Sequence, residues 1–196
     1  MRPMSRSDAP DNHLFEVIYK AVTNTSAEAH RNIFRTEVRN VYHTEKPSQK
    51  ISFLPFERRV HNKFLLWYGC RQTSLVANMR EGLRMPASEA PSTSLRFGKG
   101  IYLTDCFSKA ASQCFVDQGF DSSDASEGKR GIVFLVEVAL GDMHWAYQPE
   151  PLMQMPPQAH SVYGVGAQRP DIRGLVDLRS TKDNFAIDES ATDTKR

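Results

Sequence analysis

GIVFLVEVAL, residues Gly131–Leu140, is the stretch that decides the fold class. It is rich in β-branched and aromatic residues, and Glu137 is its only charged residue, so it predicts a buried strand. A second apolar run, FLLWYGC at Phe64–Cys70, ends in Gly-Cys and predicts another buried strand. A third strand is expected at Gly100–Thr104 (GIYLT). These runs predict a β-sheet built from segments that are far apart in the sequence.

Short helices are expected between and before these strands, over residues 12–23, 73–81 and 108–115. In the first of them, apolar residues recur every three or four positions and would share one helical face. Gly82 follows the second at the position where a C-terminal helix cap is expected. Because the helices do not alternate strictly with the strands, the pattern favours an α+β fold over a doubly wound parallel sheet.

The length of 196 residues suits one domain with tails. Residues 1–10 are polar and are expected to be disordered, residues 11–175 form the domain, and residues 176–196 are expected to be a polar, disordered tail. A net charge of +2 is too small to argue by itself for binding to nucleic acid or membrane.

The chain has three cysteines, none of them in a CxxC pair, which argues against a disulfide framework and against a zinc site. Reduced thiols fit a nuclear or cytoplasmic protein, and the first ten residues lack the apolar core of a secretion signal. No apolar run approaches the roughly 18 residues of a membrane span. The histidines show no metal-ligand spacing, so no metal is expected.

Four segments in order carry a family resemblance: His61–Arg71 (HNKFLLWYGCR), Glu81–Ala111 (ending in FGKGIYLTDCFSKAA), Phe134–Gly141 (FLVEVALG) and His160–Asp171 (HSVYGVGAQRPD). Together they resemble the catalytic domain of the poly(ADP-ribose) polymerases. The resemblance implies the split, mostly antiparallel β fold of the diphtheria-toxin-like ADP-ribosyltransferases. It also implies NAD⁺ as a substrate bound in an extended cleft, with release of nicotinamide and transfer of ADP-ribose to an acceptor.

The resemblance also assigns roles to particular residues. Gly69 would hold the nicotinamide carboxamide through its backbone, and Tyr102 would stack on the nicotinamide ring. Lys99 lies in the loop before this tyrosine, and Arg84 would support the adenine side of the cleft. An Arg84 that only interacts with the end of its helix is an equally good interpretation.

Three positions depart from the family pattern. Tyr68 stands where the family has a catalytic histidine, and its hydroxyl can still form hydrogen bonds. Ala110 replaces the carboxamide-binding serine, and Gln113 replaces a second stacking tyrosine. Ser108 or Ser112 would be the nearest substitute for the missing hydroxyl, although neither is in register.

The family also carries a catalytic glutamate in a late NEY-type strand, where a carboxylate stabilises the positive charge that develops on the ribose. Such a strand is not recognisable here, and Glu189 is the only late glutamate, so it is the one candidate for this role. A solvated acid in a polar tail is the alternative interpretation of Glu189, and the polar residues around it favour that alternative. The sequence therefore predicts that the last strand or strands of the fold are lacking. A fragment, a truncated gene product and a decayed copy would all explain this.

Two functions of different classes follow from this pattern. The first is an ADP-ribosyltransferase that moves single ADP-ribose units from NAD⁺ to a protein or nucleic-acid acceptor. The second is a catalytically inactive domain of the same fold that binds a protein or RNA partner. A third possibility, binding of nucleic acid by the mildly basic residues 1–66, has only charge in its support.

Overall fold

The computed structural model describes residues 2–3, 9–26, 35–85, 95–114, 130–150, 154–166, 168–170, 175–177, 186–188 and 194–195. The helices in these residues are α1 (Ala9–Asn24), α3 (Pro47–Arg59), α4 (Gln72–Glu81) and α5 (Phe107–Gln113). The strands are β1 (Arg2–Pro3), β2 (Tyr42–His43), β3 (Lys63–Gly69), β4 (Val133–Ala139), β5 (Met143–Ala146), β6 (Ser161–Gly164), β7 (Gln168–Arg169), β8 (Leu175–Asp177), β9 (Ala186–Asp188) and β10 (Thr194–Lys195). This arrangement confirms the α+β class.

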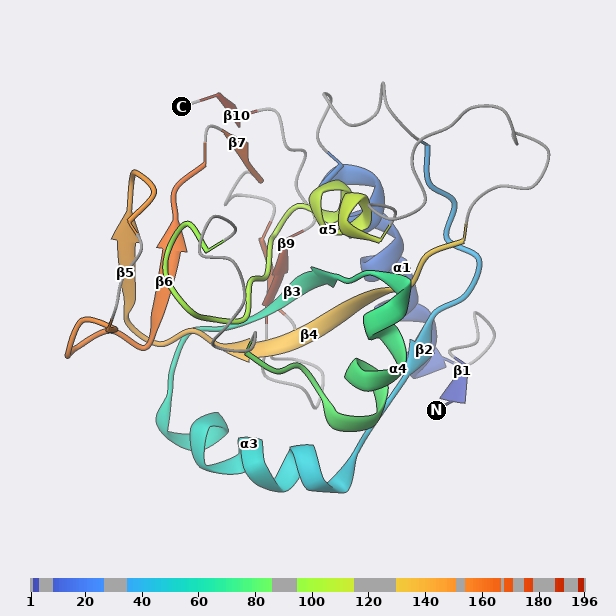
Figure 1. Ribbon diagram of the computed structural model, residues 1–196. Helices are drawn as coiled ribbons and strands as arrows, with labels where there is room; N and C mark the ends of the chain where they lie inside the picture. The colour runs from blue at the N-terminus through green and yellow to red at the C-terminus, as the bar shows by residue number, and fades with distance from the viewer. Residues whose placement is uncertain are drawn as a thin grey trace.

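The two apolar runs form the antiparallel pair β3–β4, which is the centre of the fold. Their register is unbroken from Lys63 opposite Ala139 to Gly69 opposite Val133. On its other edge β3 pairs in parallel with β9, and β9 pairs antiparallel with β8, which gives the order β4-β3-β9-β8. Figure 1 shows α1 and α5 together above the β3–β4 pair and α3 below it.

The buried core joins α1, α5 and β3. Its members are all apolar: Val17, Ile18, Ala21, Val22, Trp67, Phe107, Ala110 and Ala111. The α1 residues among them follow the spacing of three and four that predicted this helix, so its apolar face is the one that packs. The Trp67 ring meets the Phe107 ring edge-on, with centroids 5.1 Å apart. This aromatic contact fixes α5 on β3.

Helix α3 continues through Pro55 without a break. A proline inside a helix removes one backbone hydrogen bond, here the one that would reach the carbonyl of Ile51 four residues earlier. Ile51 is 67% exposed, so water can satisfy that carbonyl. The solvent-facing position of α3 explains why this helix tolerates the proline.

The expected strand at Gly100–Thr104 is wrong except at one residue. Only Thr104 pairs, through an isolated antiparallel bridge to Trp67. One edge of β3 is covered by β4 along its whole length, and the other edge is shared between β9 and Thr104. Thr104 therefore meets β3 beyond the point where β9 pairs with it.

A separate two-stranded ribbon, β5–β6, was not anticipated from the sequence. It is parallel, from Met143 opposite Ser161 to Ala146 opposite Gly164, and stands to the left of the central sheet in Figure 1. Each strand has only four residues, which is too short to give a clear alternating pattern.

Strands β9 and β10, and the last two residues of β8, lie at positions that the sequence assigned to a polar tail. Instead, β9 joins the central sheet beside β3. Strands of two or three residues give no periodic signal, so composition alone suggested a tail. Likewise, β1 and the start of α1 lie within residues 1–10. Within the described residues, no helix is long and apolar enough to cross a membrane.

Candidate functional site

The candidate site begins where the loop before α5 meets the end of β3. Trp67 and Thr104 exchange both backbone hydrogen bonds, with N–O distances of 2.8 and 3.0 Å. Because the bridge is antiparallel, the chain before Thr104, which includes Tyr102, runs toward the end of β3 that carries Gly69. Two residues that the family resemblance selected are thus directed to the same end of β3.

Tyr102 is held by its own loop. Its hydroxyl donates a hydrogen bond to the Gly98 carbonyl at 2.7 Å and accepts one from the Phe97 backbone N–H at 3.0 Å. Gly98 has a φ of 88°, which a residue with a side chain rarely adopts. The tyrosine remains 41% exposed. The loop therefore fixes the phenol while leaving part of the ring open to contact.

The same loop is anchored to the β5–β6 ribbon. A Cβ atom at Gly164, the last residue of β6, would lie 2.6 Å from the Phe97 ring. The ring therefore packs directly on the glycine backbone. This contact and the Trp67–Thr104 bridge hold the loop at two points, one on each sheet.

The floor of the site is a backbone contact between β3 and α5. A Cβ atom at Gly69 would lie 1.7 Å from the Ala110 carbonyl oxygen, so no side chain fits at this position. Ala110 is 2% exposed. This close approach requires a glycine at the end of β3, independently of any role of the Gly69 backbone in ligand binding.

Tyr68 lies on the other face of β3 from Trp67, because side chains alternate along a strand. Its ring contacts Phe134 of β4 at a centroid distance of 6.3 Å. Burial raises the pKa of its hydroxyl, and the nearby Cys70 adds to this, while the Asn78 side chain of α4 lowers it. The buried Asn78 Nδ2 forms no hydrogen bond of normal geometry within the described residues, so we regard that last interaction as weak. Tyr68 is thus protonated at neutral pH and can donate a hydrogen bond.

The other residues selected from the sequence differ in their exposure to solvent. Arg84 forms an exposed ion pair with Glu81 at 2.8 Å. Lys99 is exposed and has no ion-pair partner within the described ranges. Ser108 is 2% exposed and its hydroxyl lies 3.3 Å from the Cys106 sulfur, so it offers almost no surface to a ligand. Glu189 lies outside the described residues.

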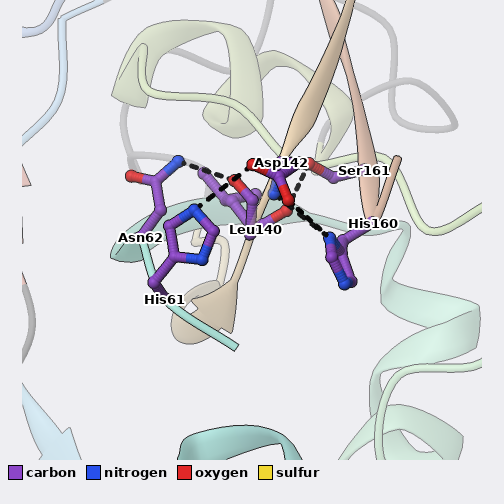
Figure 2. Close-up of polar contacts among 7 residues, drawn as sticks. His61, Asn62, Leu140, Asp142, His160 and Ser161 are labelled. Carbon is purple, nitrogen blue, oxygen red and sulfur yellow. Dashed lines mark hydrogen bonds and ion pairs between the residues drawn. The ribbon is translucent and has the colours of Figure 1, made fainter. Parts of the chain in front are cut away.

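A polar cluster at the corner between β4 and β5 was missed by sequence reasoning. The Asp142 carboxylate lies between two histidines, 3.4 Å from His61 Nε2 and 3.6 Å from His160 Nδ1 (Figure 2). The Asp142 backbone N–H also donates to His160 Nδ1 at 3.2 Å. The two histidines begin two of the resembling segments, which is a signal that could have suggested a contact.

Backbone bonds around this cluster join three chain segments. Gly141 N–H donates to the His61 carbonyl, Asn62 Nδ2 donates to the Gly141 carbonyl, and the Ser161 hydroxyl donates to the Leu140 carbonyl. The start of β3, the end of β4 and the start of β6 therefore meet here. Among the described residues, no group of three or more His, Cys, Asp or Glu side chains is arranged to hold a metal ion.

Known proteins of one family match this chain along nearly its whole length. A family model described as the poly(ADP-ribose) polymerase catalytic domain matches residues 12–195. "Poly [ADP-ribose] polymerase 1" of Xenopus laevis is 35% identical over 170 residues, which is 87% of this chain and 16% of that protein. "Poly [ADP-ribose] polymerase" of Drosophila melanogaster is 34% identical over 157 residues, 80% of this chain and 15% of that protein. The chain thus spans a small part of the length of these relatives.

Proposed function

This chain belongs to the poly(ADP-ribose) polymerase catalytic-domain family, and from that premise we propose that it binds NAD⁺ and transfers single ADP-ribose units to a protein or nucleic-acid acceptor. The observation that supports the proposal is the antiparallel Trp67–Thr104 bridge, which directs the chain segment with Tyr102 toward the end of β3 that carries Gly69. A nicotinamide carboxamide needs backbone hydrogen-bonding groups, and its ring needs an aromatic face, and these two residues offer both at one end of β3.

In the proposed reaction, the bond between C1′ of the ribose and the nicotinamide nitrogen breaks, and its electron pair leaves with nicotinamide. A nucleophilic atom of the acceptor then bonds to C1′ and gives up a proton. Tyr102 orients the leaving ring, because its phenol is fixed by Phe97 and Gly98. The protonated Tyr68 hydroxyl serves as the hydrogen-bonding group on the ribose side. Lys99 and Arg84, both exposed, supply positive charge for the pyrophosphate and the adenine side.

The carboxylate that stabilises the transition state is assigned to Glu189 in this proposal. Glu189 directly follows β9 in the sequence. Since β9 runs parallel to β3, the carboxyl ends of the two strands point in the same direction, and Gly69 lies at that end of β3. Replacement of Glu189 by Gln should abolish transfer and leave NAD⁺ binding unchanged, because the amide keeps the shape and removes the charge.

A second candidate is a catalytically inactive domain that binds a protein or RNA partner. It is favoured by the hydroxyls lost around the site: Ala110 has none, and Ser108 is 2% exposed. One missing hydrogen bond is worth about 0.5–1.5 kcal/mol, and a missing stacking face on the order of 1 kcal/mol. Three free cysteines fit a reducing nuclear or cytoplasmic location for either candidate.

Thermal unfolding of the purified chain with and without NAD⁺ separates the two candidates. A ligand at 100 times its Kd adds about 2.7 kcal/mol, which is roughly 5–10 °C in Tm for a chain of this size. We expect such a shift for the native chain and its loss in Tyr102→Ala. Tyr147→Ala is the matched control, because Tyr147 is 71% exposed and is not one of the residues that form the site.

A nicotinamide-release assay then tests turnover. Release that needs both Tyr102 and Glu189 supports the transferase. A thermal shift without release supports a domain that binds NAD⁺ but does not react it. Absence of a shift at millimolar NAD⁺, in a chain that unfolds cooperatively, contradicts the proposal. The inactive domain that binds a protein or RNA partner is then the remaining candidate.

A further inference from the structure

Two of the three cysteines line one small cavity, beside the C-terminal ends of β3 and α5. Cys70 is the first residue after β3 and Cys114 the first after α5, and they are 9% and 6% exposed. Both line a cavity of about 140 Å³ together with Gln72, Leu75, Arg130 and Ile132. From this arrangement we infer that Cys70 and Cys114 are a peroxide-sensitive thiol pair that closes into an intramolecular disulfide.

The backbone contact at Gly69 brings the two cysteines together. Gly69 packs so tightly on Ala110 that the end of β3 and the last turn of α5 lie backbone to backbone. Cys70 is one residue beyond that contact, and Cys114 is one helical turn beyond it. Both the backbone amide and the thiol of Cys70 affect the pKa of the Cys114 thiol, the amide lowering it and the thiol raising it. These are relations between near neighbours in space, although 43 residues separate the cysteines in the sequence.

The Cys114 side chain points into the region between α5 and β4. Its thiol donates to the Ile132 carbonyl at 3.3 Å and, more weakly, to the Ala110 carbonyl at 3.8 Å. These acceptors hold the sulfur at the cavity wall while the thiol is reduced. Both are backbone carbonyls, which lose only a weak S–H donor when the thiol is oxidised.

The size of the cavity bears on which oxidant can reach the thiols. This space holds several water-sized molecules, so hydrogen peroxide fits beside the two thiols. Arg130 lines the same space, and burial raises the pKa of the Cys114 thiol, so this thiol is mostly protonated at neutral pH and its thiolate is the minor, reacting form. A small peroxide can therefore reach both thiols although each is largely buried.

Hydrogen peroxide is the two-electron oxidant that disulfide formation requires. One thiolate attacks a peroxide oxygen, the O–O bond breaks, and a sulfenic acid and one water form after proton transfer. The second thiol then attacks the sulfenic sulfur, the S–O bond breaks, and a second water leaves. Two thiols and one hydrogen peroxide thus give one disulfide and two waters. The inference does not depend on the proposed transferase activity.

The test is peptide mapping of the intact 196-residue chain after mild peroxide treatment. Remaining thiols are blocked with N-ethylmaleimide in denaturant, and the unreduced digest is analysed by mass spectrometry. We expect the loss of two hydrogen atoms and one linked peptide pair that contains Cys70 and Cys114, reversed by dithiothreitol. Peroxide treatment of the guanidinium-unfolded chain is the reference, because it gives the cysteine pairs that form without tertiary structure.

Cys106 provides the matched control. It is the third free thiol, it lies at the start of α5 with its sulfur 3.3 Å from the Ser108 hydroxyl, and it does not line the cavity. Cys106→Ser should still form the link, whereas Cys70→Ser and Cys114→Ser should lose it and accumulate a dimedone-reactive sulfenic acid. Links through Cys106 in the folded native chain, or oxidation of both cavity thiols without a link between them, would overturn the inference.

Discussion

Gly69 and Ala110 meet backbone to backbone, and the space between them leaves no room for even a methyl group. The same contact positions the candidate carboxamide site on one side and the Cys70–Cys114 pair on the other. A single glycine therefore sets the distance between the central sheet and α5, and the predictions begin there.

Gly69→Ala should destabilise the chain strongly. The new Cβ atom would lie 1.7 Å from a backbone oxygen, so β3 and α5 must separate. Overpacking of a closed core costs about 1–3 kcal/mol and occasionally more, and we expect the upper end here because backbone cannot rotate away. Urea unfolding measures this loss in the free energy of unfolding. Gly100→Ala is the control, since a Cβ there meets nothing within 4 Å; equal effects in the two variants would refute the contact.

Tyr102→Phe should loosen the loop while keeping the ring. The variant loses the hydrogen bonds to Gly98 and Phe97, which together are worth about 1–3 kcal/mol at about 0.5–1.5 each. We expect a lower urea midpoint and faster amide exchange at Phe97. Tyr147→Phe, at a residue that is 71% exposed, should change neither quantity. Unaltered exchange at Phe97 would mean that the hydroxyl does not hold the loop.

Phe107→Ala should remove the main aromatic contact between α5 and β3. Phe107 is 8% exposed and meets Trp67 edge-on. Truncation of a buried phenylalanine costs about 3–5 kcal/mol through lost burial and the cavity left behind. Phe56→Ala on α3, at a residue that is 57% exposed, should cost far less. Guanidinium unfolding compares the two, and similar losses would contradict the assignment of the core.

Alkaline pH should destabilise the fold in two steps. Burial raises the pKa of the Cys114 thiol above 9.0 and that of the Tyr68 hydroxyl above 10.0. The folded state therefore holds these protons more tightly than the unfolded state does. Their contribution is complete below pH 9 and is lost as pH rises from these ordinary values through the folded-state pKa values.

Urea midpoints between pH 8 and pH 11 check this sign. Cys114→Ala should flatten the lower part of the decline, and Tyr68→Phe the part above pH 10, because each removes one titrating group. A native midpoint that rises over this range, or an unchanged profile in both variants, would show that these groups are not the cause.

The sequence predicted most of the elements that form the core. Residues 12–23, 64–70 and 131–140 were identified because apolar residues recur with helical spacing or in compact runs, and α1, β3 and β4 occupy these places. The strand expected at 100–104 is reduced to one bridge at Thr104, and its apolar residues did not reveal that Tyr102 bonds within its own loop. The β5–β6 ribbon and β9 were too short to leave a pattern.

The sequence by itself determined the family, the two central strands and the residue types at the candidate site, since these follow from burial patterns and ordered motifs. Only the tertiary structure decided which residues meet. The bridge between Trp67 and Thr104, the histidines around Asp142 and the neighbouring Cys70 and Cys114 all join residues far apart in the chain. The physical reason is that periodicity records which face of an element is buried, whereas the partner of that face is fixed only when all the elements pack together.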